Sequence, residues 1–266
     1  MKKEIQKLLK DLEKKNKIKI LFAVENGSRA WRMESEDSDY DVRFVFKKEL
    51  KKYISIEQPN DVINASFDNS FKPCNPEGAL IDISGFDIFK FVKLLLTSNP
   101  TVIEWLNSDI IYHGKQNKVL KHFAINNFNP IALYYHYKSL SKNNYLKYIK
   151  TGQHVTGKKY LYTFRGLINS KWVEVKNTIP PIRFTEALEK IDKIIPNSVL
   201  KDIKDLIELK KKGFEKDKIK NNYYLDKYIE SFLKEEPKIK QKENPKNKEI
   251  LNKELRNIIL SYRKFR

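Results

Sequence analysis

The chain has 266 residues, of which 40% are apolar and 12% aromatic, and it carries a formal net charge of +19. This composition predicts a folded protein with one large or two small domains and argues against a disordered chain. The single cysteine, Cys74, excludes an internal disulfide framework.

The chain carries no sign of membrane insertion or export. No apolar run approaches the roughly 18 residues of a membrane span. The first five residues, Met-Lys-Lys-Glu-Ile, do not begin the hydrophobic stretch of a signal peptide. We therefore expect a cytoplasmic protein without membrane contact.

Helical and strand patterns mix in the first part of the chain. Hydrophobic spacing predicts an amphipathic helix over residues 1–15. Apolar runs predict strands at 18–24, 40–46, 61–67 and 79–84. Helices follow at 86–96 and 100–107, the second begun by Asn99 and Pro100 as cap and first turn.

Helical patterns dominate the remainder, at 130–149, at 157–175, beyond Arg183 and at 249–262. A polar loop before residue 130 predicts a boundary between a domain of residues 1–129 and a domain of residues 130–266. The Lys, Glu and Pro content of residues 235–248 predicts an exposed linker. The fold class is thus α+β, a mixed sheet with helices followed by an α-helical domain.

Charge separates the two parts. Residues 1–130 hold 21 basic and 18 acidic residues, a net charge of +3, whereas the rest hold 32 and 16, a net charge of +16. A strongly basic domain predicts a surface for a polyanion, since phosphate binding releases counterions. The alternative is that the high lysine content reflects an AT-rich genome, and that many of these lysines are ordinary solvated residues on helix faces.

Three aspartates form the sharpest candidate site. Side chains of a strand alternate, so Asp39 and Asp41 are expected to project from one face. Asp82, between two isoleucines, adds a third carboxylate from a neighbouring strand. Such a group favours a hard divalent cation that offsets the repulsion. Asp87 is a competing third carboxylate, but its place before a helix indicates a cap.

A phosphate site is expected beside these carboxylates. Gly27 permits close backbone approach, and Ser28 and Arg29 open a segment whose free N–H groups attract phosphate. The ten residues between Ser28 and Asp39 suffice for a short helix and a turn. This arrangement is expected to return the phosphate loop to the carboxylates.

The helix over 157–175 carries a second candidate group. Lys158, Tyr162, Arg165 and Asn169 follow spacings of four, three and four, so they lie along one stripe. Lys158 or the adjacent Lys159 would offset phosphate charge, Tyr162 or Tyr160 would stack on a base, and Arg165 would fork onto phosphate oxygens. A separate stripe, expected to be buried, is Leu161, Phe164, Leu167 and Ile168. The alternative is an ordinary amphipathic helix.

The order hydrophobic-Gly-Ser, about ten residues, Asp-hydrophobic-Asp-hydrophobic and a later hydrophobic-Asp-hydrophobic resembles the DNA polymerase β superfamily of nucleotidyltransferases. The strings GSRAW, SDYDVRF, LIDISGFDIFKF, SNPTVIEWL and KKYLYTFRGL resemble its RlaP or YcgL-like members, which are associated with RNA repair. The resemblance extends from about Val24 to about Pro181. Two departures are Arg32, where a glycine is expected, and Phe89, where a basic residue is expected. Arg32 is expected to alter the phosphate loop.

The resemblance implies a polymerase-β-like catalytic domain followed by a helical domain that binds nucleotide and acceptor. It implies two Mg²⁺ ions, with Mn²⁺ as the substitute, at Asp39, Asp41 and Asp82. The substrate would be a nucleoside triphosphate, most simply ATP, and the acceptor the 3′ end of an RNA. Two other classes stay open, namely nucleotidylation of a protein or small molecule, and a non-catalytic nucleic-acid-binding module.

Overall fold

The computed structural model describes residues 1–57, 59–152, 155–214, 217–239 and 248–261. Contacts divide them into two compact units. Unit 1 comprises the described residues of Met1–Ala30, Asp39–Phe128 and Asn244–Arg266, and unit 2 those of Trp31–Ser38 and Asn129–Glu243. No helix in these residues is long and apolar enough to cross a bilayer.

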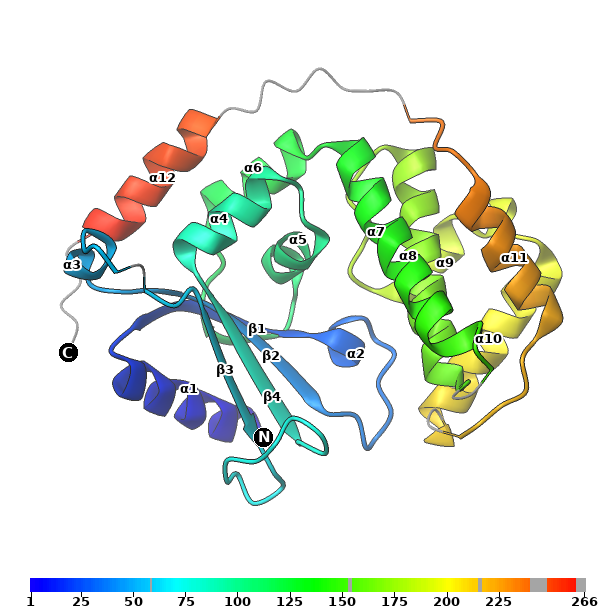
Figure 1. Ribbon diagram of the computed structural model, residues 1–266, viewed down its shortest axis with the longest axis horizontal. Helices are drawn as coiled ribbons and strands as arrows, with labels where there is room; N and C mark the ends of the chain where they lie inside the picture. Colours follow the sequence, from blue (N-terminus) through cyan, green and yellow to red (C-terminus); the bar gives the residue numbers. More distant parts are fainter. Residues whose placement is uncertain (58, 153–154, 215–216, 240–247, 262–266) are drawn as a thin grey trace. The chain divides into compact units, whose positions relative to one another are not determined.

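Unit 1 is built on a five-stranded mixed sheet with the strand order β3-β4-β2-β1-β5 (Figure 1). Strand β1 (Lys19–Asn26) pairs antiparallel with β2 (Tyr40–Lys47) and with β5 (Ile111–Gly114). Strand β2 pairs in parallel with β4 (Ile81–Asp87), which pairs antiparallel with β3 (Val62–Phe67). The expected mixed sheet is therefore confirmed, with β5 as an unpredicted edge strand.

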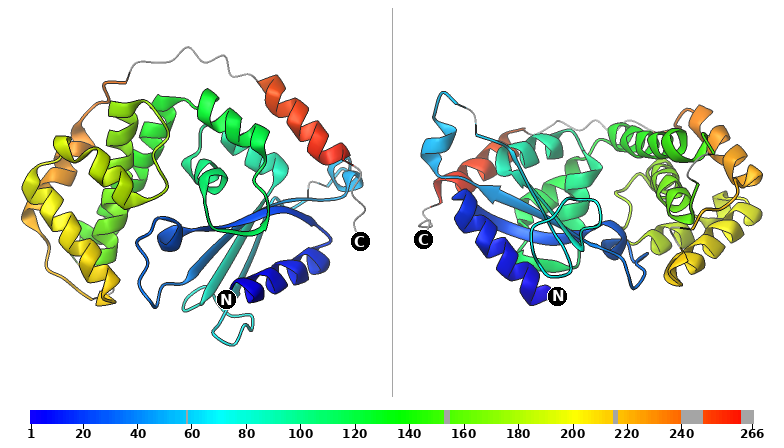
Figure 2. Two further views of the ribbon diagram at one scale, coloured as in Figure 1. Left: turned by 180° about the vertical axis from the view of Figure 1, so that it is seen from behind. Right: turned by 60° about the horizontal axis from the view of Figure 1, so that its bottom comes forward.

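Helices cover both faces of this sheet, as Figures 1 and 2 show. On one face, α1 inserts Ile5, Leu9 and Leu12 into a core that includes Val42 and Phe44 of β2. On the other face, the rings of Phe22 and Phe91 lie 5.8 Å apart. The helices of unit 1 are α1 (Lys2–Asn16), α2 (Gly27–Ala30), α3 (Leu50–Tyr53), α4 (Ile88–Leu96), α5 (Pro100–Asn107), α6 (Lys118–Asn127) and α12 (Lys248–Leu260).

Caps explain where the predicted helices begin. Asn99 accepts from the N–H of Thr101 at the start of α5, as its sequence predicts. Strand β4 runs three residues beyond its predicted end, and Asp87 then caps α4 by accepting from the N–H of Phe89 at 2.9 Å. The interpretation of Asp87 as a cap is thus confirmed. Its carboxylate also accepts from Tyr53, and burial raises its pKa.

The last described helix belongs to unit 1. Helix α12 contacts α4 and α6. The buried ammonium of Lys47, at the end of β2, donates to the carbonyl of Ile258 at 2.7 Å and to that of Ser261 at 3.2 Å. A cation thus satisfies the final carbonyls of α12. The compact units differ from the predicted domains here and at residues 31–38, and 240–247 of the predicted linker lie outside the described residues.

Unit 2 is helical, as expected. Its elements are α7 (Pro130–Asn144), the π-helix η1 (Tyr145–Ile149), α8 (Gly157–Lys176), α9 (Phe184–Lys190), the 3₁₀ helix η2 (Asp192–Ile194), α10 (Asn197–Lys211) and α11 (Tyr223–Lys234). Helices α7 and α8 approach closely at Gly166, where an added Cβ would lie 2.8 Å from the carbonyl oxygen of Tyr137. The predicted buried stripe is confirmed, since Leu161, Phe164, Leu167 and Ile168 are fully buried.

Candidate active site

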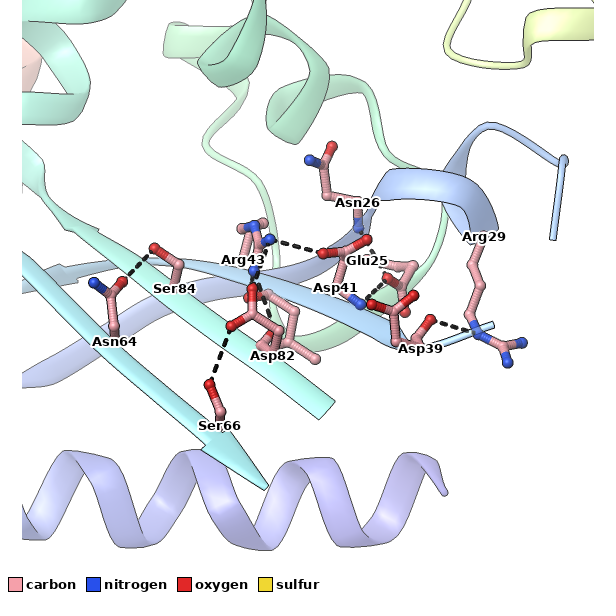
Figure 3. Close-up of polar contacts among 11 residues, drawn as sticks. Glu25, Asn26, Arg29, Asp39, Asp41, Arg43, Asn64, Ser66, Asp82 and Ser84 are labelled. Atoms are coloured by element: carbon pink, nitrogen blue, oxygen red, sulfur yellow. Dashed lines mark hydrogen bonds and ion pairs between the residues drawn. The ribbon is translucent and has the colours of Figure 1, made fainter. Parts of the chain in front are cut away.

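The parallel pairing of β2 with β4 brings two of the three predicted aspartates together. Asp41 and Asp82 are register partners on adjacent strands. The guanidinium of Arg43 lies between them, with Nη2 at 2.8 Å from Asp41 Oδ1 and 2.9 Å from Asp82 Oδ2 (Figure 3). The sequence predicted a divalent cation beside these carboxylates, but Arg43 was not among the predicted site residues. Its position two residues after Asp41 places it on the same strand face by the same alternation.

Arg43 is further fixed by the sheet backbone. Its Nη1 donates to the carbonyl oxygens of Val42 and Asp82 at 3.1 and 3.0 Å. Ser66 of β3 donates to the other oxygen of Asp82 at 3.4 Å. The two carboxylates are therefore held by three neighbouring strands, and both remain partly exposed.

Gly27 brings the backbone of the predicted phosphate loop against the carboxylate of Asp41. The residue has a φ of +62°, and a Cβ built on it would lie 1.8 Å from Asp41 Oδ2. Glycine is required here both by the left-handed backbone and by this close approach. Ser28 follows as a buried residue in the four-residue helix α2.

Asp39 and Arg29 lie at the α2 end of this cluster (Figure 3). Asp39 immediately precedes β2, and its carbonyl oxygen accepts from Arg29 Nε at 3.1 Å. The Arg29 guanidinium lies 3.9 Å from the centre of the Tyr40 ring. Within the described residues no three acidic, histidine or cysteine side chains are gathered closely enough to hold a metal ion.

A buried carboxyl behind Asp41 is a further feature that sequence reasoning missed. Glu25 of β1 is fully buried. Its Oε1 accepts from the N–H groups of Asp41 at 2.8 Å and Asn26 at 3.2 Å, and its Oε2 accepts from Tyr112. Burial raises the pKa of Glu25 to about 7, although these hydrogen bonds oppose the shift. An acidic residue inside an otherwise apolar strand pattern was the available signal.

The donor chemistry of this cluster fits a hard divalent cation. Carboxylate oxygens are the preferred ligands of Mg²⁺, which usually takes its remaining ligands from water and substrate phosphates. Asp41 and Asp82 supply such oxygens at one partly exposed spot beside the Gly27 backbone. Asp39 lies two residues away in the chain. The same residues would hold Mn²⁺.

In unit 2 the predicted helical group is assembled around Trp31. The Arg165 guanidinium lies 3.6 Å from the centre of the Trp31 ring, and the Tyr162 ring meets Trp31 edge-on at 5.5 Å. Lys158 Nζ lies 5.8 Å from the Tyr162 ring. Arg165 and Asn169 are buried, whereas an ordinary amphipathic helix, the alternative interpretation, would leave them exposed. Lys159 instead lies over Tyr148, at 3.7 Å from the ring centre.

Arg32, which stands where the family pattern has a glycine, follows Trp31 directly. Arg32 has a φ of 58°, a left-handed conformation that glycine adopts most easily. The arginine therefore keeps a backbone geometry that glycine would favour. Its effect on the phosphate loop remains a prediction.

Comparisons with known proteins agree with the motif resemblance. Over 219 residues the chain is 37% identical to the protein YcgL of Bacillus subtilis (strain 168), described as uncharacterized, covering 82% of this chain and 79% of that protein. A crystal structure of a nucleotidyltransferase-like protein from Exiguobacterium sibiricum 255-15 aligns with 95% of this chain and 76% of its own. The alignment has 11% identity and a TM-score of 0.30, too low to bear on function.

The family comparison is more extensive. Residues 1–257 match the family RlaP, described as the RNA repair pathway DNA polymerase beta family. This family indicates a nucleotidyltransferase of the polymerase β type. The chain belongs to the RNA repair pathway DNA polymerase beta family.

Proposed function

We propose that the protein transfers a nucleoside monophosphate from a nucleoside triphosphate, preferably ATP, to the 3′-hydroxyl of an RNA end. The hydroxyl oxygen forms a bond to the α-phosphorus while the bond to the bridging oxygen of the β-phosphate breaks. Pyrophosphate leaves with that oxygen. The observation that supports this most is the close approach of the Gly27 backbone to the Asp41 carboxylate, because Gly27 begins the segment that we propose as the phosphate loop.

Each residue has a proposed role. Asp39, Asp41 and Asp82 would hold two divalent ions, Mg²⁺ or Mn²⁺. When bound, these ions would lower the pKa of the attacking hydroxyl and offset the charge of the leaving pyrophosphate. Asp82 accepts the proton of the hydroxyl, and Gly27 and Ser28 hold the β- and γ-phosphates through backbone amides and the serine hydroxyl.

Cationic side chains complete the binding of the triphosphate. In unit 1, Arg29 lies next to Ser28 and contributes positive charge to the phosphates. In unit 2, Lys158 and Lys159 offset phosphate charge, Tyr162 stacks on the base, and Arg165 forks onto phosphate oxygens. The stacking of Arg165 on Trp31 holds its fork in one orientation.

A transfer assay tests the proposal. The protein is incubated with Mg²⁺ and each α-labelled triphosphate in turn, with RNA, DNA or no polymer. We expect label on RNA 3′ ends, and Asp39→Ala or Asp41→Ala to reduce it at least about a hundredfold, since each removes metal ligation that no neighbour replaces.

Asp61→Ala is the matched control for these variants. Asp61 is also an aspartate of unit 1, but its side chain is exposed and pairs with Lys90 at 3.0 Å. Its removal should leave transfer unchanged. Full activity of a folded Asp41→Ala protein would refute the site, and label on protein instead of RNA would refute the proposed acceptor.

A further inference from the structure

Two tyrosines of unit 2 hold their rings out to solvent. Tyr223 and Tyr224, the first residues of α11, are 67% and 71% exposed. Their rings meet edge to face at 5.8 Å, and Lys227 Nζ lies 5.6 Å from the Tyr223 ring. Tyrosines usually bury most of their apolar area, so such paired exposure beside a cation indicates a contact surface.

The segment before these tyrosines is basic and fixed in place. Lys218 and Lys220 are exposed, while the backbone between and beside them is tied to the start of α8. Lys218 forms a β-bridge with Thr156, and the N–H of Ile219 donates to the carbonyl of Val155 at 3.0 Å. The lysines therefore project from a supported strand-like segment.

The segment before α11 also contacts the short π-helix η1. Asn221 Nδ2 donates to the carbonyl of Ile149 at 3.2 Å, so the chain leading into α11 passes the ends of α7 and α8 (Figure 1). In that helix the half-buried ring of Tyr148 has Lys147 Nζ at 5.0 Å and Lys159 Nζ at 3.7 Å. A hydrogen bond from Lys147 and the charge of Lys159 lower the pKa of Tyr148. The short helix that holds Lys147 and Tyr148 thus contacts the segment that leads into Tyr223 and Tyr224.

We propose that this lysine–tyrosine surface, formed by Lys147, Tyr148, Lys218, Lys220, Tyr223 and Tyr224, binds a single-stranded nucleic acid. Unpaired bases stack on exposed rings, and spaced ammonium groups follow the phosphates. A duplex hides its base faces within its own stack, and an acidic peptide offers the rings no stacking partner. The proposal rests on the proposed function only in that the bound strand is taken as the acceptor.

Binding is measured without turnover, by fluorescence anisotropy of a labelled, 3′-blocked single-stranded RNA of about 12 nucleotides, long enough for several stacked bases. No triphosphate or Mg²⁺ is added. We expect Tyr223→Ala/Tyr224→Ala to weaken binding at least about tenfold. We expect Lys218→Ala/Lys220→Ala to reduce the slope of log affinity against log salt by about 1.4, the value for two phosphate contacts of a single strand.

Two matched controls separate this surface from general effects. Tyr135→Ala removes another exposed tyrosine of unit 2, whose hydroxyl bonds Glu236. Lys7→Ala/Lys10→Ala removes two exposed lysines from α1. Both should bind RNA like the unaltered protein. Equal loss in tyrosine variant and control, unchanged affinity of the tyrosine variant, or equal affinity for duplex RNA would each overturn the proposal.

The outcome is distinguishable from failure of the proposed function. If RNA binding depends on these tyrosines but no triphosphate is transferred to RNA, the surface stands and the transfer proposal fails. If RNA is extended while the tyrosine variant binds and extends it normally, the transfer proposal stands and this surface fails.

Discussion

The charged side chains of the two units are arranged differently, closely paired on strands in unit 1 and spaced along helix ends and turns in unit 2. In unit 1, Asp41 and Asp82 share one arginine, and a buried glutamate lies behind one of them. Every one of these positions follows from strand register. In unit 2, lysines and tyrosines project from helix ends and turns. Strand register can hold side chains at short, defined distances, whereas a flexible polymer is better bound by side chains spaced along a surface.

The strongest disruption of the unit 1 arrangement is expected from Gly27→Ala. The new methyl group would collide with Asp41 Oδ2, at 1.8 Å, so the carboxylate must move away from its present position. A displacement of about 1 Å can reduce a rate about a hundredfold, and we expect at least that loss of nucleotide transfer.

Gly78→Ala is the control for this change. Gly78 also has a positive φ, +86°, but a Cβ there would meet no atom within 4 Å. Both variants thus share the backbone strain, and only Gly27→Ala displaces Asp41. Equal activities of the two variants would show that the contact with Asp41 is unimportant.

Glu25→Gln tests the buried side of the same cluster through pH. The folded protein keeps the Glu25 proton up to a pKa of about 7, whereas the unfolded chain loses it near 4.5. Between these values the folded state binds more protons, so the stability of the unaltered protein falls as pH rises and then levels off. Relative to the variant, it should lose about 2 to 3 kcal/mol between pH 5 and pH 8.

Urea unfolding of both proteins at several pH values, in the presence of a chelator, measures this difference. The glutamine keeps an acceptor for the N–H groups of Asn26 and Asp41 but does not titrate. Parallel stability profiles would contradict the assignment of the shift to Glu25.

Arg43→Met should have a somewhat smaller effect on stability. The variant leaves Asp41 and Asp82 without their shared counter-charge, and because these groups are partly exposed we expect a loss of about 1 to 2 kcal/mol without metal. Added Mg²⁺ should then raise the melting temperature more than it does for the unaltered protein. Arg43→Lys, which keeps the charge but not the fork, is the control; equal Mg²⁺ effects in all three would exclude competition between arginine and metal.

Arg165→Ala tests the proposed contact of unit 2 with the triphosphate and has the smallest expected effect. Loss of the guanidinium should raise the KM for the triphosphate about tenfold with little change in kcat, as for lost ground-state binding. Arg165→Lys should restore only part of this, since lysine cannot stack flat on Trp31 or fork onto two oxygens. An unchanged KM would indicate that this helix does not contact the triphosphate.

Local patterns predicted much of the fold. Hydrophobic spacing and caps predicted α1, β1, β2, α4, α5 and α8, because each depends on residues near in sequence. The edge strand β5 has only four residues and was not predicted. The pairing of Asp41 with Asp82 in register depends on parallel strands joined by a long connection, which no local pattern specifies.

The sequence predicted some residues of the candidate site but not the contacts between them. The alternation that selected Asp39 and Asp41 should also have selected Arg43, whose charge was not considered. Glu25 could be found only by asking which polar residue interrupts an apolar strand. The contact between Trp31 and Arg165 joins residues far apart in sequence and could not be inferred from the stripe alone.

The order of synthesis delays the pairing of the Lys47 ammonium with the end of α12. Strand β2 leaves the ribosome long before residues 258–261, whose carbonyls are its acceptors. Until they emerge, this lysine must stay hydrated, because an unpaired buried ammonium is strongly unfavourable. The sheet that carries Asp41 therefore reaches its final form only after residues 258–261 have been synthesised, which is later than the described helices of unit 2.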